Sequence, residues 1–225
     1  GETLHGDYNT WVNDVMLDSC TNYECYKGIH SSFNSRNFFE ILYSFNRQFG
    51  KEPWCLYTGK NLLSFVDNHD VTRIASILEK KEQLPLVYGM LFTMPGIPAI
   101  YYGSESGVEG VKSGNDTGIR PEIEQPDWNE LTDLIARLTE IRRSEPALAY
   151  GDYTQIALTN TACVYQRSHD GDTIWYAVNI DDNPMTMQVH RDVQAEDLLS
   201  GEKLEIHGSL DLQPGQMRIL KLQAA

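Results

Sequence analysis

Four polar residues in a row follow a short apolar segment in the first third of the chain. The segment FVDNHD, residues 65 to 70, presents a carboxylate, an amide, an imidazole and a second carboxylate at successive positions. In parallel α/β proteins, functional groups collect at the carboxyl ends of strands, where the loops toward the next helices begin. FVDNHD therefore predicts a functional site at the end of a buried strand that spans residues 62 to 67.

Asp67 and Asp70 also have a simpler explanation. Asp and Asn often begin helices, because their side chains accept hydrogen bonds from the first free backbone N–H groups. In that case both carboxylates cap a helix that starts near Val71 and Thr72, and His69 forms an ordinary hydrogen bond. The residues alone leave both explanations open.

Further polar groups are predicted at comparable strand ends, which favours the functional explanation. They are Glu2, the segment TNYE (21 to 24) and the segment YYGSE (101 to 105). Carboxylates that meet aromatic rings at one edge are typical of carbohydrate sites, because acids cleave the glycosidic bond and rings stack on sugar faces.

The elements that must position these groups alternate along the first 149 residues. Strands are predicted at residues 17 to 24, 62 to 67 and 97 to 105, and helices at residues 37 to 49, 83 to 94 and 127 to 148, the last with Asp127 as its N-cap. This alternation indicates parallel βα units. From about residue 150 to residue 225, short alternating strands separated by turn residues predict an antiparallel β module.

The totals restrict the class of protein. The 225 residues are 41% hydrophobic, which suffices for one large domain or for a medium and a small one. Eighteen basic and 32 acidic residues give a net charge of −14, which disfavours nucleic acid and anionic membranes as partners. No apolar segment is long enough for a membrane span, and the first ten residues lack a signal pattern, so we expect neither a span nor targeting.

Cysteine and histidine spacing argues against metal sites. Cys20, Cys25, Cys55 and Cys163 lack C-x-x-C spacing and are too sparse for a disulfide scaffold, which predicts free thiols and a cytoplasmic protein. The residues His5, His30, His169, His190 and His207 show no metal-ligand spacing. Asn115 and Asp116 do not follow a recognised calcium-loop pattern. We expect no structural metal and no cofactor.

Several other side chains are weaker candidates. Exposed rings could serve as sugar platforms, although aromatic residues more often belong to the core; the candidates are Trp11, Trp54, Tyr57 and Tyr102. Tyr102 is the best placed, beside the end of the third predicted strand. Glu105 and Arg120 could line the site or form a solvated ion pair. The glycine-rich segment 107 to 118 predicts a loop above the site.

Several motifs together resemble the alpha-amylase family of glycoside hydrolases. Residues 62 to 73 (LLSFVDNHDVTR) resemble the family's motif at the seventh strand of its (β/α)₈ barrel, and residues 93 to 105 (TMPGIPAIYYGSE) resemble the eighth strand. The opening GETLHG resembles the end of the fifth strand. Residues 16 to 29 resemble the sixth strand of cyclomaltodextrinase and neopullulanase-type members. The resemblance implies an α/β fold, in which residues 1 to 149 form the second half of a TIM barrel and residues 150 to 225 an antiparallel β-sandwich.

The resemblance also implies roles for individual residues. Glu2 corresponds to the proton donor, Asp70 to the carboxylate that stabilises the oxocarbenium-like transition state, and His69 to a ligand of sugar hydroxyls. Asn68 and Tyr102 are expected to contact substrate beside them. The family's nucleophilic Asp lies on the fourth strand in a G-x-R-x-D motif, and no such motif precedes Glu2.

The expected function follows from this comparison. It is that of a fragment of a retaining glycoside hydrolase for α-1,4-glucans or cyclomaltodextrins, inactive alone because a retaining mechanism needs a nucleophile as well as an acid. The alternatives are a non-catalytic carbohydrate-binding or scaffold protein and a shortened form made to study the fold. The expected partners are an α-glucan and either the missing N-terminal half of the barrel or a second copy of the chain, because half a barrel leaves strand edges uncovered.

Overall fold

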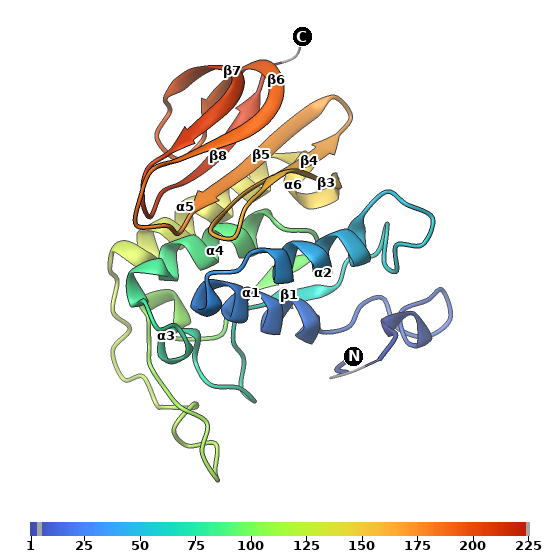
Figure 1. Ribbon diagram of the computed structural model, residues 1–225. Coiled ribbons are helices and arrows are strands. Elements are labelled where there is room, and N and C mark those ends of the chain that lie inside the picture. The colour runs from blue at the N-terminus through green and yellow to red at the C-terminus, as the bar shows by residue number, and fades with distance from the viewer. Residues whose placement is uncertain (4–5, 224–225) are drawn as a thin grey trace.

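The computed structural model describes residues 1–3 and 6–223, as a helical part and a C-terminal antiparallel sheet that packs on it (Figure 1). The helices are α1 (Tyr23–Ser35), α2 (Phe39–Phe49), α3 (Ile74–Ile77), α4 (Leu84–Thr93), α5 (Glu130–Ser144) and α6 (Pro146–Tyr150), with short 3-10 turns at Tyr8–Thr10, Lys81–Gln83 and Ser104–Ser106. The strands are β1 (Leu63–Phe65), β2 (Ile97–Ala99), β3 (Asp152–Leu158), β4 (Ala162–His169), β5 (Asp172–Asn179), β6 (Met185–Asp197), β7 (Lys203–Leu212) and β8 (Met217–Leu222).

Strands β1 and β2 lie side by side and run parallel, with Leu63 opposite Ile97. The predicted strands at 62 to 67 and 97 to 105 are therefore neighbours, although both are shorter than expected. The second cannot extend to residue 105, because Gly103 takes a positive φ of 81° and a 3-10 turn follows at Ser104–Ser106. The carboxyl ends of the two strands thus point the same way and bring the segments that follow them together.

The predicted strand at 17 to 24 is wrong. A single bridge pairs Thr21 with Leu63, and α1 already begins at Tyr23. The side chain of Asn22 accepts a hydrogen bond from the backbone N–H of Cys25, and Glu24 lies in the positively polarised first turn. This N-terminal cap ends the extended segment after Thr21.

The helix predicted at 127 to 148 is divided in two. Its N-cap is Asn129 rather than Asp127, because Asn129 forms a reciprocal capping box with Thr132. Pro146 begins α6, and the residue before a proline avoids the helical conformation, so α5 ends at Ser144. The other two predicted helices correspond to α2 and α4 within two residues at each end.

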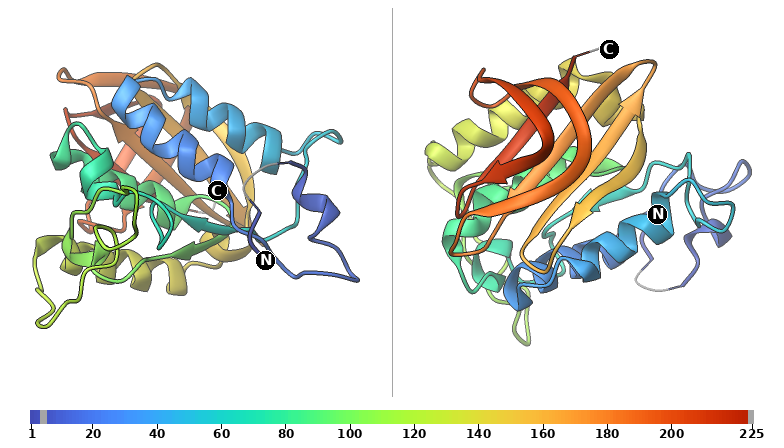
Figure 2. Two further views of the ribbon diagram at one scale, coloured as in Figure 1. Left: turned by 90° about the horizontal axis from the view of Figure 1, so that it is seen from below. Right: turned by 45° about the horizontal axis from the view of Figure 1, so that its top comes forward.

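The C-terminal strands form one continuous sheet in the order β3-β4-β5-β8-β6-β7, not the two separate sheets expected of a sandwich. The pairing of β6 with β7 shifts register between Gln188 and Asp192, where His190 has a φ of 51°. Such a bulge bends a strand and increases its twist. The sheet therefore curls (Figure 2), and its two ends enclose a second apolar cluster that includes Trp175 and Leu210.

The main core lies between the helices and the face of the sheet that packs on them. Tyr165 and Tyr176 point from β4 and β5 into the same buried cluster as Phe45 of α2. Burying a large apolar side chain contributes about 2 to 3 kcal/mol, so this shared cluster is a major source of stability for both parts. Among residues 1–3 and 6–223, no helix is long and apolar enough to cross a membrane.

Candidate active site

The two carboxylates of FVDNHD, Asp67 and Asp70, differ in burial and in their contacts. Asp67 is only 2% exposed, and its Oδ2 accepts a 2.9 Å hydrogen bond from the backbone N–H of Ile74, the first residue of α3. It also accepts a hydrogen bond of 2.8 Å from the Ser104 hydroxyl. Burial raises the pKa of Asp67, while these hydrogen bonds act in the opposite direction. Asp67 is not the N-cap residue of α3, which is Arg73, but its carboxylate binds the first backbone N–H of that helix, so Asp67 has a structural role.

Asp70 does not cap a helix. Its Oδ2 lies 3.3 Å from Nε2 of His69, and its Oδ1 lies 3.1 Å from Nη2 of Arg120. The Asn68 side chain accepts a 2.8 Å hydrogen bond from the backbone N–H of Asp70, which forms the local turn that Asn favours. This turn sends the Asp70 carboxylate away from α3 to a partly exposed edge.

Glu2 reaches the same edge from the first segment of the chain. One oxygen of Glu2, one oxygen of Asp70 and one ring nitrogen of His69 all lie within 4.8 Å of one another. The hydroxyl of Tyr23 donates a 2.7 Å hydrogen bond to Glu2 Oε1 and accepts a 2.9 Å hydrogen bond from the Asn68 amide. Three segments that are distant in sequence therefore meet here.

Tyr23 was not predicted as a site residue. It begins α1, so its ring is fixed by the helix, and it packs edge-on against Phe65 with centroids 4.9 Å apart. Burial and the adjacent Glu2 carboxylate raise the pKa of Tyr23 to about 12, so its hydroxyl remains a proton donor at neutral pH. The only signal in the sequence was its place in TNYE, beside a predicted strand end.

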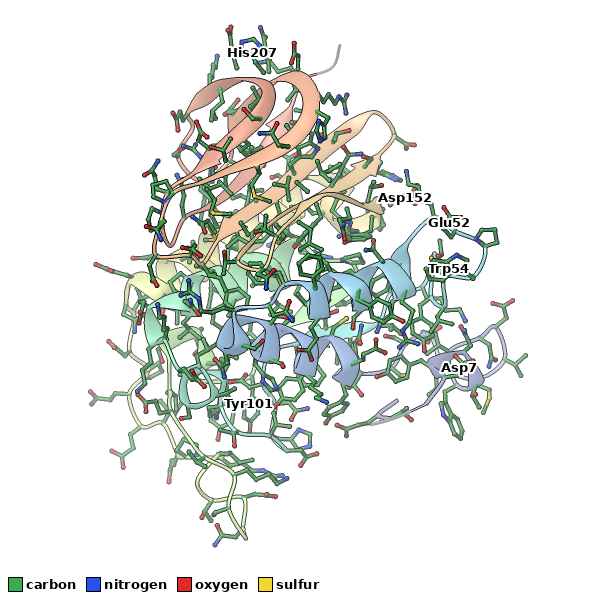
Figure 3. All side chains as sticks on the ribbon, in the orientation of Figure 1. Asp7, Glu52, Trp54, Tyr101, Asp152 and His207 are labelled. Carbon is green, nitrogen blue, oxygen red and sulfur yellow. The ribbon has the colours of Figure 1, made fainter. Side chains whose placement is uncertain are left out.

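The aromatic pair after β2 is arranged differently from expectation. Tyr102 is 44% exposed, and its hydroxyl donates to the backbone oxygen of Pro121 at 2.9 Å. Tyr101, labelled in Figure 3, lies nearer the site, with its ring centroid 6.5 Å from that of His69. The guanidinium carbon of the buried Arg73 lies 4.0 Å from the Tyr101 ring centre, a cation–π contact that holds the ring in place.

Two cations contact the site, Lys112 from the predicted loop at 107 to 118 and Arg120 just after it. Arg120 donates from Nε to the His69 backbone oxygen at 2.9 Å and pairs with Asp116 at 2.8 Å. Lys112 donates to the Asp70 backbone oxygen at 2.6 Å. Of the two alternatives for Glu105 and Arg120, the ion pair is wrong, because Arg120 binds Asp70 and Asp116 instead, and Arg120 lines the site.

Some of the weaker candidates occupy other environments. Tyr57 is buried and stacks on Tyr8 with centroids 5.3 Å apart, so it belongs to the core and cannot be a sugar platform. Trp11 and Trp54 are exposed, and Figure 3 shows Trp54 on a loop at the far end of α2. The Asn115 side chain accepts a hydrogen bond from the Thr117 hydroxyl, so its oxygen already has a local partner.

Two chemical uses fit this geometry. Two carboxylates and an imidazole that lie this close together could bind a cation. The positive charge of Arg120, which is paired with Asp70, would repel a cation at this position. Proton transfer fits better. Among residues 1–3 and 6–223, the recorded side-chain partner of Glu2 is Tyr23, which binds Oε1, and Asp70 reaches the same edge with Oδ2, which lies against His69 rather than Arg120.

Comparisons with known proteins place the chain in a family. Residues 1–138 match the alpha-amylase catalytic domain. A cyclomaltodextrin glucanotransferase from Bacillus sp. (strain 38-2) is 32% identical over 120 residues, which cover 52% of this chain and 16% of that protein. The glucanotransferase from Geobacillus stearothermophilus is 28% identical over 144 residues, or 64% of this chain and 20% of its own length.

Solved structures share the fold. An alpha-amylase from Anoxybacillus superposes with a TM-score of 0.79 at 22% identity, covering 100% of this chain and 52% of that chain. CldA, a cyclomaltodextrin glucanotransferase, gives 0.77 at 23% identity over 93% of this chain and 45% of its own. The chain thus spans about half the length of these structures and a smaller share of the curated relatives. The match over residues 1–138 shows that the chain belongs to the alpha-amylase family.

Proposed function

We propose that this chain carries the acid-bearing part of an active site for α-1,4-glucans or cyclomaltodextrins, within the second half of a (β/α)₈ barrel. The observation that carries the proposal is the convergence of Glu2, His69 and Asp70 within 4.8 Å. The names of the relatives, amylases and glucanotransferases, support an α-glucan as substrate. AmyP, whose structure superposes with a TM-score of 0.79 at 18% identity over 99% of this chain and 55% of its own, was solved with maltotriose.

Each side chain has a defined task in this proposal. Glu2 donates a proton to the glycosidic oxygen, and the hydrogen bond from Tyr23 orients its carboxyl group. The negative charge of Asp70 stabilises the positive charge that develops on the sugar ring. His69 binds sugar hydroxyls next to the cleaved bond. Asn68 and Tyr102 are the further residues expected to contact the substrate.

The 225-residue polypeptide by itself should not hydrolyse glucans. A retaining mechanism needs a nucleophile opposite the acid, and loss of either removes most of the rate. A protein that binds carbohydrate without catalysis is the alternative function. A G-x-R-x-D motif upstream of Gly1 in the natural gene would support the enzyme, and its absence there would support the binding protein.

Titration with maltotriose tests the proposal. We expect the ring signals of His69 in the NMR spectrum to shift, and we expect Asp70→Asn to weaken binding without unfolding the chain. Starch and cyclomaltodextrin should remain intact. If maltotriose leaves the His69 signals unchanged at every concentration, the edge around Glu2 is not a glucan site.

The state of the cysteines supports a reducing compartment. All four are free, and Cys20, Cys25 and Cys163 are buried. Since disulfides persist mainly in oxidising compartments, we infer a cytoplasmic location.

A further inference from the structure

A second surface of the chain has the composition of a sugar-binding groove. It lies between the loop at 50 to 55 and β3, the edge strand of the C-terminal sheet, and it encloses about 500 Å³. Trp54 forms part of its wall and is 62% exposed. Figure 3 shows Trp54 and Glu52 on this loop, beyond the end of α2 and near Asp152 at the start of β3.

The loop holds Trp54 in a defined position. The backbone N–H groups of Leu56 and Tyr57 donate to Arg47 and Gln48 of α2 at 2.9 and 2.7 Å. A Cβ atom on Gly50 would lie 2.5 Å from the backbone oxygen of Asn46, so the loop can approach α2 only because residue 50 is glycine. An exposed indole on an anchored loop loses little conformational freedom on binding.

Polar groups line the groove together with the indole. Asn46 donates from Nδ2 to Gln155 Oε1 at 2.7 Å, and each amide retains a further acceptor or donor. Lys51 and Glu52 contribute one charge of each sign, so the groove has no net charge from its lining. An aromatic face beside neutral hydrogen-bonding groups suits a neutral ligand with an apolar face and many hydroxyls, which is a sugar.

We propose that this groove binds an α-1,4-glucan chain at a second site, with Trp54 stacked on a glucose ring and Asn46 and Gln155 bonded to its hydroxyls. The choice of glucan rests on the proposed function. The groove shares no residue with the edge around Glu2 and Asp70, so the two sites can be tested separately. A second site would keep a long glucan attached while its end is processed.

The indole N–H signals in the NMR spectrum give a direct test, because the chain has four tryptophans. On addition of maltoheptaose to the 225-residue chain, we expect the Trp54 signal to shift and to saturate at millimolar concentration. Trp128 is the matched control, because it is 70% exposed but donates to Asp133 at 2.7 Å and lies outside the groove. Trp54→Ala should weaken binding at this site about tenfold, and Trp128→Ala should not.

The remaining measurements distinguish the groove proposal from the proposed function. The double variant Glu2→Gln, Asp70→Asn should keep the Trp54 response. In the wild-type chain, a Trp54 response without any His69 response would support the groove and contradict the proposed function. If the His69 signals shift and the Trp54 signal does not, the groove proposal is wrong and the proposed function is unaffected. Equal shifts with a β-1,4-linked oligosaccharide would overturn its selectivity for α-glucans. A Trp54 signal that changes with protein concentration in the absence of sugar would mean that a second copy occupies the groove, and would also overturn it.

Discussion

Arg120 contacts both residues of the His69–Asp70 pair. Its Nη2 lies 3.1 Å from Asp70 Oδ1, and its Nε donates to the His69 backbone oxygen at 2.9 Å. Asp116 holds the same guanidinium at 2.8 Å. One side chain from the loop that follows β2 therefore sets the orientation of two residues that follow β1.

Replacement of Arg120 should affect binding more than stability. We expect Arg120→Gln to change the free energy of unfolding by less than about 1 kcal/mol, because its ion pairs are partly exposed. Affinity for maltotriose should fall roughly fivefold, since Asp70 and His69 lose their shared anchor. Titration calorimetry measures the affinity and urea unfolding the stability. Arg137→Gln, which removes an exposed pair with Glu140, is the control, and equal affinities in the two variants would contradict this role.

The two aspartates of FVDNHD should differ in their effect on stability. Asp67→Ala removes the acceptor for Ile74 and Ser104 inside the protein, so we expect a loss of about 2 to 4 kcal/mol. Asp70→Asn should cost less than about 1 kcal/mol, because the Asp70 side chain is partly exposed. Urea denaturation compares the two variants. Similar losses would mean that Asp70 also has a structural role.

His30 should make stability depend on pH. Burial lowers the pKa of His30 below its ordinary value of 6.5, and the nearby Lys27 acts in the same direction while Glu40 opposes it. The unfolded chain therefore binds the proton more readily, so stability is full above pH 6.5 and falls as the pH drops from there toward the lowered pKa. Unfolding measured between pH 5 and 7 should show this slope, and His30→Gln should reduce it. An unchanged slope in the variant would exclude His30 as its cause.

The parallel pair β1–β2 should promote association. Within the part of the chain that the structure describes, β2 pairs with β1 alone, and Ile97 is 49% exposed. Parallel sheets are normally covered on both faces, and a free edge is a template for pairing. We expect the pure chain to self-associate at tens of micromolar, as seen by sedimentation, unless a partner supplies the rest of the barrel. Ile97→Lys should reduce association, and a wild-type chain that stays monomeric would show that this edge is protected.

Much of the local structure could be predicted because it depends on short-range patterns. In α2, Ile41, Leu42 and Phe45 are all fully buried on one face, as their helical spacing requires. The start of α1 was missed because the extended pattern of residues 17 to 21 runs directly into the Asn22 cap. The single curled sheet was missed because it depends on the bulge around His190, and a register shift has no clear signature in alternation.

The same division applies to the candidate site. Glu2, His69 and Asp70 stood in motifs that could be compared with a family. Tyr23 and Arg120 contribute through contacts between segments, and such contacts depend on how α1 and the loop after β2 are placed in space. Spacing along the chain carries no information about them.

A crystal structure of the chain with maltotriose tests the central claim most directly. The account predicts a glucose unit at the edge formed by Glu2, His69 and Asp70, with sugar hydroxyls within hydrogen-bonding distance of His69 and with the Glu2 carboxyl group facing a glycosidic oxygen. Two results would contradict it. One is a crystal in which maltotriose occupies another surface and leaves this edge empty, and the other is a sugar bound at the edge without contact to Glu2 and Asp70.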